Sequence, residues 1–140
     1  MNDYKYIWVP FLSWFSVQLT KFITDLVKNK KVDLKVLVAS GGMPSSHSSI
    51  VTSLMTLIGI NEGFDSILFA IAFVFGMIVM YDAAGVRRAA GKQAGILNQL
   101  IYSNQVKVNT NEKLKELIGH TPKQVFVGAL WGIVLGIICA

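Results

Sequence analysis

The sequence has little charge and almost no cysteine. Charged residues make up 15% of its 140 residues and hydrophobic residues 53%, and the mean hydropathy is +0.53. This balance differs strongly from that of an ordinary soluble domain with one core, and it indicates a small integral membrane protein. The single cysteine, Cys139, excludes a disulfide bond within the chain, and we interpret it as an inert apolar residue near the C-terminus.

A secretory leader and a soluble basic domain are also missing. A leader has a basic start, a short apolar core and a small-residue cleavage site, whereas residues 4–23 form an aromatic-rich apolar run that we interpret as a retained membrane span. The net charge of +5 and the pI near 9.4 are common in nucleic-acid-binding proteins, but the chain offers no soluble basic domain for that purpose. We therefore expect no nucleic-acid partner.

Four apolar segments predict an all-α fold, a polytopic membrane helical bundle with about four spans and short interfacial helices. The segments are residues 6–21, 48–60, 66–84 and 121–140. The second is shorter than the roughly 20 residues that cross the hydrocarbon core, so we expect its helix to begin at Pro44 and to be buried among the others. Residues 36–39 predict a half-inserted helix, and residues 1–140 are expected to form one membrane-embedded domain.

Charge is unevenly distributed among the connections between these segments. Every basic residue except Lys5 lies within residues 21–35 or 87–123, on one side of the predicted membrane, whereas the connection at 61–65 contains two acids, Glu62 and Asp65, and no base. Basic loops stay in the cytoplasm. The pattern predicts a multi-pass plasma-membrane protein with both termini outside and a basic cytoplasmic face suited to anionic phospholipid headgroups.

A turn rich in glycine and hydroxyl groups precedes the second segment. It reads Gly41-Gly42-Met43-Pro44-Ser45-Ser46-His47. The glycines let the backbone approach a ligand closely, the proline favours a helical start, and the serine hydroxyls and free N–H groups are hydrogen-bond donors. The turn is therefore suited to a phosphate.

The other histidine of the chain, His120, directly precedes the last apolar segment. Residues 110–119 predict a short amphipathic helix that ends at Gly119, and Thr121 and Pro122 predict the start of the next helix. The dipole of that helix disfavours an imidazolium, so a neutral His120 is a candidate nucleophile toward phosphorus. The alternative is a histidine that only forms hydrogen bonds at the membrane interface, and the local sequence alone favours it.

The third segment continues into a basic helix with many small residues. Its spacing predicts two neighbouring faces, one with Tyr81, Gly85, Arg88, Lys92 and Gly95 and the other with Ala84, Arg87, Gly91 and Ala94. Arg88 and Lys92 would project toward the same anion, although an ordinary basic membrane flank has the same composition. Asp82 requires a cationic partner, Arg88 or Lys21, and a metal-binding role is the weaker interpretation because no other acids cluster nearby.

Three motifs carry a resemblance to a known superfamily. They are Gly42-Met43-Pro44-Ser45-Ser46-His47, Tyr81-Asp82-Ala83-Ala84-Gly85-Val86-Arg87-Arg88 and His120-Thr121-Pro122-Lys123-Gln124-Val125-Phe126-Val127-Gly128. Together they resemble the divergent branch of the type 2 phosphatidic acid phosphatase superfamily, which includes lipid phosphatases and vanadium haloperoxidases. The resemblance extends from Gln18 and Lys21 to the last span.

The resemblance implies a role for each site residue. His120 would attack phosphorus and form a phosphohistidine, and His47 would protonate the leaving alkoxide. The phosphoryl group would be bound and neutralised by a set of cations and hydroxyl groups, namely Arg88, Arg87, Lys21, Lys92, Ser45 and Ser46. The mechanism uses these fixed cations, with no metal and no other cofactor.

The sequence departs from the superfamily pattern at three points. No Arg-Pro follows Lys21, no arginine lies six residues before His120, and Gln124 stands where an acid normally orients the nucleophile. The Gln124 amide can accept the imidazole N–H but stabilises the developing cation less than a carboxylate does, and Asp82 is a second candidate for that orienting role.

Two functions follow from these residues. The first is a lipid phosphatase that acts on a phosphate ester such as phosphatidylglycerophosphate or phosphatidic acid, and the paired histidines favour it. The second is a non-catalytic protein that binds an anionic lipid or phosphate, which Gln124 and the missing arginine favour. Four helices can hardly enclose a headgroup pocket, so we expect a homodimer or larger assembly, with intramolecular packing as the alternative for the candidate interface of Phe69, Phe73, Gly76 and Met80.

Overall fold

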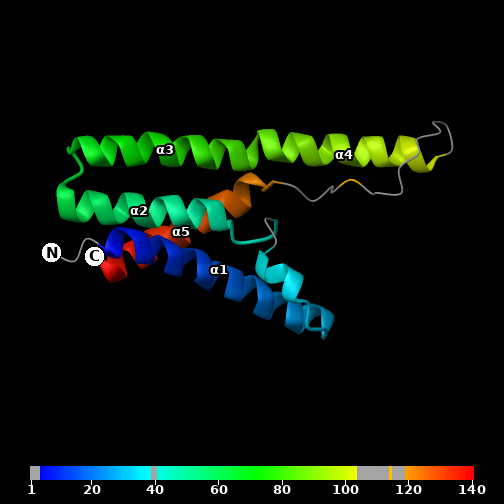
Figure 1. The fold of residues 1–140 in the computed structure, drawn as a ribbon, viewed down its shortest axis with the longest axis horizontal. Helices are drawn as coiled ribbons and strands as arrows, with labels where there is room; N and C mark the ends of the chain where they lie inside the picture. The colour runs from blue at the N-terminus through cyan, green and yellow to red at the C-terminus, as the bar shows by residue number, and fades with distance from the viewer. Residues whose placement is uncertain (1–3, 39–40, 104–113, 115–118) are drawn as a thin grey trace.

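Four helices lie side by side in the computed structural model, and a fifth extends beyond them (Figure 1). The structure describes residues 4–38, 41–103, 114 and 119–140. The helices are α1 (Lys5–Asn29), α2 (Ser46–Glu62), α3 (Ile67–Ala84), α4 (Val86–Tyr102) and α5 (Pro122–Cys139), and a 3₁₀ helix, η1, covers Leu34–Val38. The described residues contain no strand, so the predicted all-α fold is confirmed.

Helix α2 is the centre of the bundle and contacts α1, α3 and α5. It begins at Ser46 and not at Pro44 as predicted, because Ser45 has an extended backbone and its hydroxyl accepts the N–H of Ser48 at 3.3 Å. This cap satisfies one of the free donors of the first turn. Pro44 therefore belongs to the preceding turn and not to the helix.

Helix α5 lies directly on α2 through a row of glycines. Gly128, Gly132 and Gly136 recur at intervals of four residues, so they share one helical face, and all three are buried. Each faces one turn of α2: Gly128 faces Ser45, Gly132 faces Ser49 and Gly136 faces Ser53. The partners advance in the same sense along both helices. The two helices are consequently parallel, and their N-termini lie at the same end of the bundle.

Polar side chains of the bundle bind main-chain and side-chain groups of neighbouring helices. The hydroxyl of Thr52 lies 3.0 Å from the carbonyl oxygen of Ala129, and that of Ser13 donates to the carbonyl oxygen of Ser49 at 3.1 Å. The indole N–H of Trp131 donates to the hydroxyl of Ser16 at 2.9 Å. Such bonds, together with close packing of small residues, hold helices together in lipid, where apolar burial alone provides no driving force.

The two ends of the bundle differ in chemistry. At one end the Tyr6 hydroxyl donates to Glu62 at 2.6 Å, and Nζ of Lys5 lies 3.3 Å from the backbone oxygen of Ala140, so the start of α1 and the C-terminus lie beside the α2–α3 connection (Figure 1). The opposite end contains the N-termini of α2 and α5 and the junction of α3 with α4. The basic segments adjoin this second end, which is the grouping that the charge pattern predicts.

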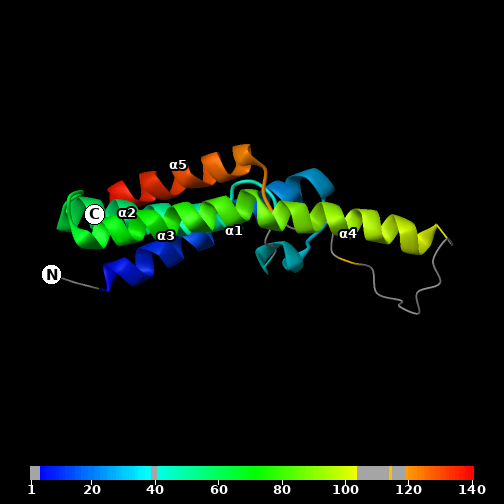
Figure 2. The ribbon, with the colours of Figure 1, turned by 90° about the horizontal axis from the view of Figure 1, so that it is seen from above.

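Helix α4 continues along the line of α3 past the end of the bundle (Figures 1 and 2). The buried face of α4 contains Gly91, Ala94 and Asn98. Asn98 is hydrogen-bonded to both backbone groups of Leu114, at 2.8 and 3.0 Å. The helix predicted at residues 110–119 lies outside the described residues except for Leu114 and Gly119, and η1 covers most of the patch predicted at 36–39.

Two helical stretches of the described chain are long and apolar enough to cross a membrane. The first is residues 67–102, which comprise α3 and α4, and the second is α5. Large apolar side chains cover the outer surface of α3, among them Ile67, Leu68, Ile71, Val74 and Phe75. Gly76, part of the candidate dimer interface, instead packs on Met55 of α2, which is the intramolecular alternative for that position.

The glycine contact between α2 and α5 predicts the effect of a single added methyl group. In Gly132→Ala the new Cβ would overlap the Ser49 carbonyl and the Thr52 hydroxyl, so we expect a loss of about 1–3 kcal/mol of stability. The measurement is thermal unfolding in detergent. Gly95→Ala is the matched control, since Gly95 is half-buried on α4, outside the contact between α2 and α5, and an equal loss in both variants would contradict the role of this contact.

Candidate functional site

His47 and His120 meet at the end of the bundle where α2 and α5 begin. His47 is the second residue of α2, and His120 directly precedes Thr121, the N-cap of α5. Their ring centroids are 5.7 Å apart, with the planes inclined at 64°. His120 is only 1% exposed, whereas His47 is half-buried. The parallel packing of α2 and α5 thus brings the two histidines together across 73 positions of sequence.

The segment before α5 is fixed on the α3–α4 junction. The N–H of His120 donates to the carbonyl oxygen of Ala83 at 2.9 Å. Gly119 has a φ of +91°, and a Cβ at this position would overlap the backbone of Arg87 and Arg88. Only glycine fits both the conformation and the close approach. The backbone of His120 is therefore placed by α3 as well as by α5.

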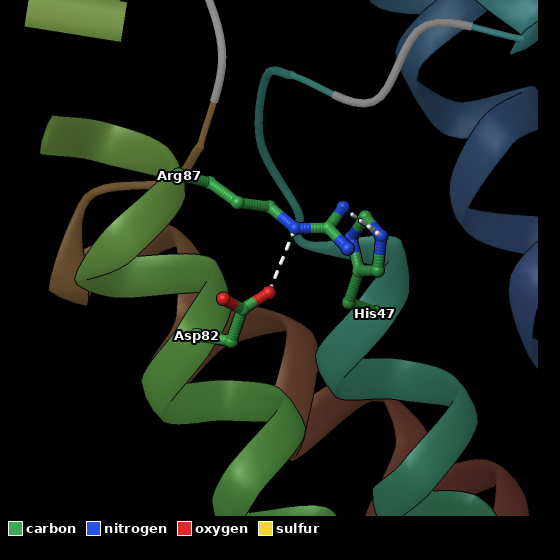
Figure 3. Close-up of polar contacts among 3 residues, drawn as sticks. All are labelled: His47, Asp82 and Arg87. Carbon is green, nitrogen blue, oxygen red and sulfur yellow. Dashed lines mark hydrogen bonds and ion pairs between the residues drawn. The ribbon is translucent and has the colours of Figure 1, made fainter. Parts of the chain in front are cut away.

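Arg87 joins the acid Asp82 to His47 (Figure 3). Its Nε donates to Oδ2 of Asp82 at 2.8 Å, and its Nη1 lies 3.1 Å from Nε2 of His47. A guanidinium group can only donate, so Nε2 of His47 is the acceptor and the proton of the neutral ring is on Nδ1. The Arg87 and Asp82 side chains are 43% and 42% exposed, so the ion pair itself adds little stability.

Lys21 lies beneath the glycine turn with its charge unpaired. It is 5% exposed, and its Nζ has no hydrogen-bond partner among the residues that the structure describes. Its aliphatic stem passes 3.8 Å from the position of a Cβ on Gly42, whose φ is +88°. A buried ammonium without a partner is costly. An anionic ligand at this point would supply the missing partner.

The surroundings of both histidines lower their pKa and so favour the neutral ring. Burial, and then the charge of Arg87, lowers the pKa of His47 below its ordinary value of 6.5, against an opposing effect of Asp82. Burial, and then the charge of Lys21, lowers the pKa of His120. Gln124 and the backbone of Gly42 oppose this shift in the pKa of His120, but neither makes a hydrogen bond of ordinary geometry with its ring. A neutral His120 has the free lone pair that a nucleophile requires.

The structure distinguishes the two arginines that the sequence left open. Arg87 is on the inner face of α4 and contacts the site, whereas Arg88 and Lys92 are exposed on the neighbouring face. The partner of Asp82 is Arg87, in place of the predicted Arg88 or Lys21. Arg88 and Lys92 are thus not among the residues that the fold gathers around the histidines.

The two serines of the glycine turn are buried, and the Ser45 hydroxyl is hydrogen-bonded within the protein. The hydroxyl oxygen of Ser45 accepts from the N–H and the hydroxyl of Ser48, and its own N–H donates to the carbonyl of Gln124 at 3.0 Å. Ser46 is buried, and its carbonyl accepts from the hydroxyl of Ser49 at 3.3 Å. These contacts fix the start of α2, and therefore the position of His47.

Gln124 caps a helix where it was expected to orient a ring. Its Oε1 accepts the N–H of Thr121 at 2.9 Å, and the Thr121 hydroxyl accepts the N–H of Gln124 at 3.4 Å, which together form a capping box. Leu114, six residues before His120, is exposed and presents no charge. Arg87 provides positive charge near the histidines from another helix.

Asn98 makes a contact that the sequence did not predict. Its side chain forms two hydrogen bonds with the backbone of Leu114, which ties Leu114 to α4. The sequence could have indicated this contact, because Asn98 lies on the same helical face as the small residues Gly91 and Ala94 and is the amide side chain on that face. Among the described residues, no three His, Cys, Asp or Glu side chains are grouped to hold a metal ion.

The sequence matches the family model described as the Divergent PAP2 family over residues 2–135. The chain belongs to the Divergent PAP2 family. The chain is also similar to YuiD of Bacillus subtilis (strain 168), which is named as an uncharacterized membrane protein. The two sequences are 41% identical over 135 residues, which cover 88% of this chain and 85% of YuiD. No solved structure matches the chain. Membership of the Divergent PAP2 family confirms the resemblance that the three motifs carry.

The lowered pKa values of this Divergent PAP2 site predict how stability depends on pH. An unfolded histidine takes up a proton near pH 6.5, whereas folded His47 and His120 do so only at lower pH, so the unfolded state binds more protons in between. The contribution of the two histidines to the free energy of unfolding is complete above pH 6.5 and is lost as pH falls below that value. Thermal unfolding in detergent from pH 8 to pH 5 measures this loss. His47→Asn/His120→Asn should weaken the dependence, and an unchanged slope would contradict it.

Proposed function

We propose that this protein is a lipid phosphatase that hydrolyses a phosphate ester of an anionic membrane lipid through a phosphohistidine intermediate on His120. The observation that carries the proposal is the pair of histidines, with ring centroids 5.7 Å apart, beside Arg87 and the buried Lys21, whose Nζ has no described partner. Phosphatidylglycerophosphate and phosphatidic acid are the candidate substrates. The site would face the cytoplasm from the plasma membrane, as the basic segments around it favour.

Positive potential at the site has two sources. Arg87 and Lys21 are fixed cations, and the parallel α2 and α5 both direct their N-terminal dipoles to the same end of the bundle. Phosphoryl transfer depends mainly on positioning and on charge stabilisation of the equatorial oxygens. The site has the components for both, supplied by residues of α1, α2, α4 and the segment before α5.

Substrate binding would release His47 from Arg87. Without ligand, the Arg87 guanidinium occupies Nε2 of His47 and, like Lys21, disfavours a charged ring. A phosphate competes for the guanidinium, and its negative charge favours the protonated imidazole. His47 would then take up a proton from solvent at Nε2, ready for the leaving oxygen, and would return one to solvent when phosphate leaves.

The reaction balances with these groups alone. A ring nitrogen of His120 attacks phosphorus, so that a P–N bond forms as the P–O bond to the alcohol breaks, and His47 gives its proton to the leaving alkoxide. His47 then takes a proton from water, whose oxygen attacks the phosphohistidine. Inorganic phosphate leaves, and His120 returns to its neutral form.

A non-catalytic role in binding an anionic lipid or phosphate is the second candidate. It is favoured by the position of Gln124, whose Oε1 is bonded to Thr121 and leaves the His120 ring without a carboxylate to stabilise its positive charge. Binding requires only Lys21, Arg87 and the helix N-termini. Activity measurements on the two histidines distinguish the candidates.

Phosphate release from phosphatidylglycerophosphate and phosphatidic acid in detergent tests the catalytic roles. We expect His120→Ala to lose at least about 1,000-fold in rate, because the nucleophile is gone. His47→Ala should lose about 100-fold to 10,000-fold, the usual contribution of a general acid. Vanadate should inhibit and a chelator should not. Release that is unaffected by His120→Ala would contradict the mechanism, and binding of both lipids without release from either would support the second candidate.

The neighbouring arginines provide a matched pair of variants. Arg87→Ala should lower the rate about 100-fold, because it removes a cation beside His47. Arg88→Ala removes the same charge from an exposed position one residue away, and we expect less than about a threefold change, as for a screened surface charge. Initial rates at saturating lipid measure both. Equal losses would contradict the assignment of Arg87 to the site.

A further inference from the structure

A groove opens beside Lys21, between α1 and the glycine turn. Its volume is about 500 Å³, within the range of ordinary ligand pockets. One wall is a polar face of α1, which contributes Thr20, Lys21, Thr24, Asp25 and Lys28. The opposite wall comes from Val36 and residues 41–44. None of these residues except Lys21 and the turn has a part in the proposed chemistry.

The α1 wall of the groove has several hydrogen-bond acceptors, whereas a phosphate site requires donors and positive charge. The hydroxyls of Thr20 and Thr24 donate to carbonyl oxygens one turn earlier, at 2.8 and 2.7 Å, so their oxygens have lone pairs left to accept. Asp25 adds a carboxylate, one oxygen of which accepts from Asn29 at 2.7 Å. A carboxylate repels a phosphate but accepts from a hydroxyl group. The acceptor set therefore suits a hydroxylated ligand.

Lys21 connects the groove to the phosphate site. Its side chain contributes to the lining of the groove, its ammonium is buried without a described partner, and the same charge lowers the pKa of both histidines. Lys28 follows two turns later on α1, roughly 10 Å further along the helix. A phosphate held at Lys21 would thus have the next part of its molecule in the groove, among the Thr20, Thr24 and Asp25 oxygens.

We propose, on the basis of the phosphatase function above, that this groove binds a polyol headgroup and makes the enzyme specific for a phosphate carried on such a headgroup. The favoured substrate is then a lipid whose terminal phosphate is attached to a glycerol-like group. Phosphatidic acid is disfavoured, since its phosphate is joined directly to the diacylglycerol and has no free hydroxyl group for the groove. A free polyol phosphate has the same chemistry as the lipid headgroup.

The experiment compares three probes with the purified full-length protein. They are phosphatidylglycerophosphate and phosphatidic acid with identical acyl chains, in mixed micelles, and water-soluble glycerol 3-phosphate. The readouts are kcat/KM for phosphate release and, separately, lipid binding by native mass spectrometry. Thr24→Val and Asp25→Asn remove acceptors with little change of shape, and Asp65→Asn removes an exposed carboxylate at the other end of the bundle as the matched control.

We expect the wild type to prefer phosphatidylglycerophosphate to phosphatidic acid by at least about tenfold, and each groove variant to reduce that ratio about fivefold, the usual effect of one hydrogen bond. The reduction should lie in KM, and Asp65→Asn should keep the wild-type ratio. Comparable kcat/KM for glycerol 3-phosphate would identify the free polyol phosphate as the source of the ligand. Release without a preference, or variants that leave the ratio unchanged, would overturn the groove. Selective binding without any release would overturn the phosphatase function and leave the groove supported.

Discussion

The parallel contact between α2 and α5 is the constraint on which the rest of the structure depends. Because Gly128, Gly132 and Gly136 have no side chains, the backbone of α5 lies against Ser45, Ser49 and Ser53 of α2. Parallel helices that touch along their length must begin at the same end. The parallel packing of α2 and α5 therefore brings two helix N-termini together, and with them His47 and His120. The anion binding that we propose would thus be a consequence of how small residues pack in a membrane bundle.

The remaining charge comes from helices that approach this end from other directions. Lys21 reaches it from α1, and Arg87 from the first turn of α4, immediately after the Gly85 junction. Arg87 thus places a positive charge beside His47, whereas Leu114, six residues before His120, is uncharged. The unliganded site therefore holds more positive charge than it can neutralise, with Asp82 as the partner of Arg87 and nothing described as the partner of Lys21. That imbalance is the physical basis for expecting a phosphate.

Periodicity and charge were sufficient to predict the all-α fold and the common end of the two histidines. They could not choose between Arg87 and Arg88, since adjacent residues lie about 100° apart on a helix and only the packing of α4 decides which one faces inward. They also misplaced the start of α2 at Pro44. The Ser45 hydroxyl accepts the N–H of Ser48 and caps the helix, so α2 begins at Ser46. Gln124 has a motif position that suggests ring orientation, yet the backbone of Thr121 lies closer. These distinctions depend on tertiary contacts.

The central claim is that His120 forms a covalent bond to phosphorus, and mapping the phosphorylated residue tests it most directly. The protein would be mixed with isotopically labelled lipid phosphate, quenched within one turnover under conditions that preserve phosphohistidine, digested, and sequenced by mass spectrometry. The account predicts labelled phosphate on His120 and its absence in His120→Ala. Labelled phosphate on another residue, or substrate turnover without any labelled protein, would contradict it.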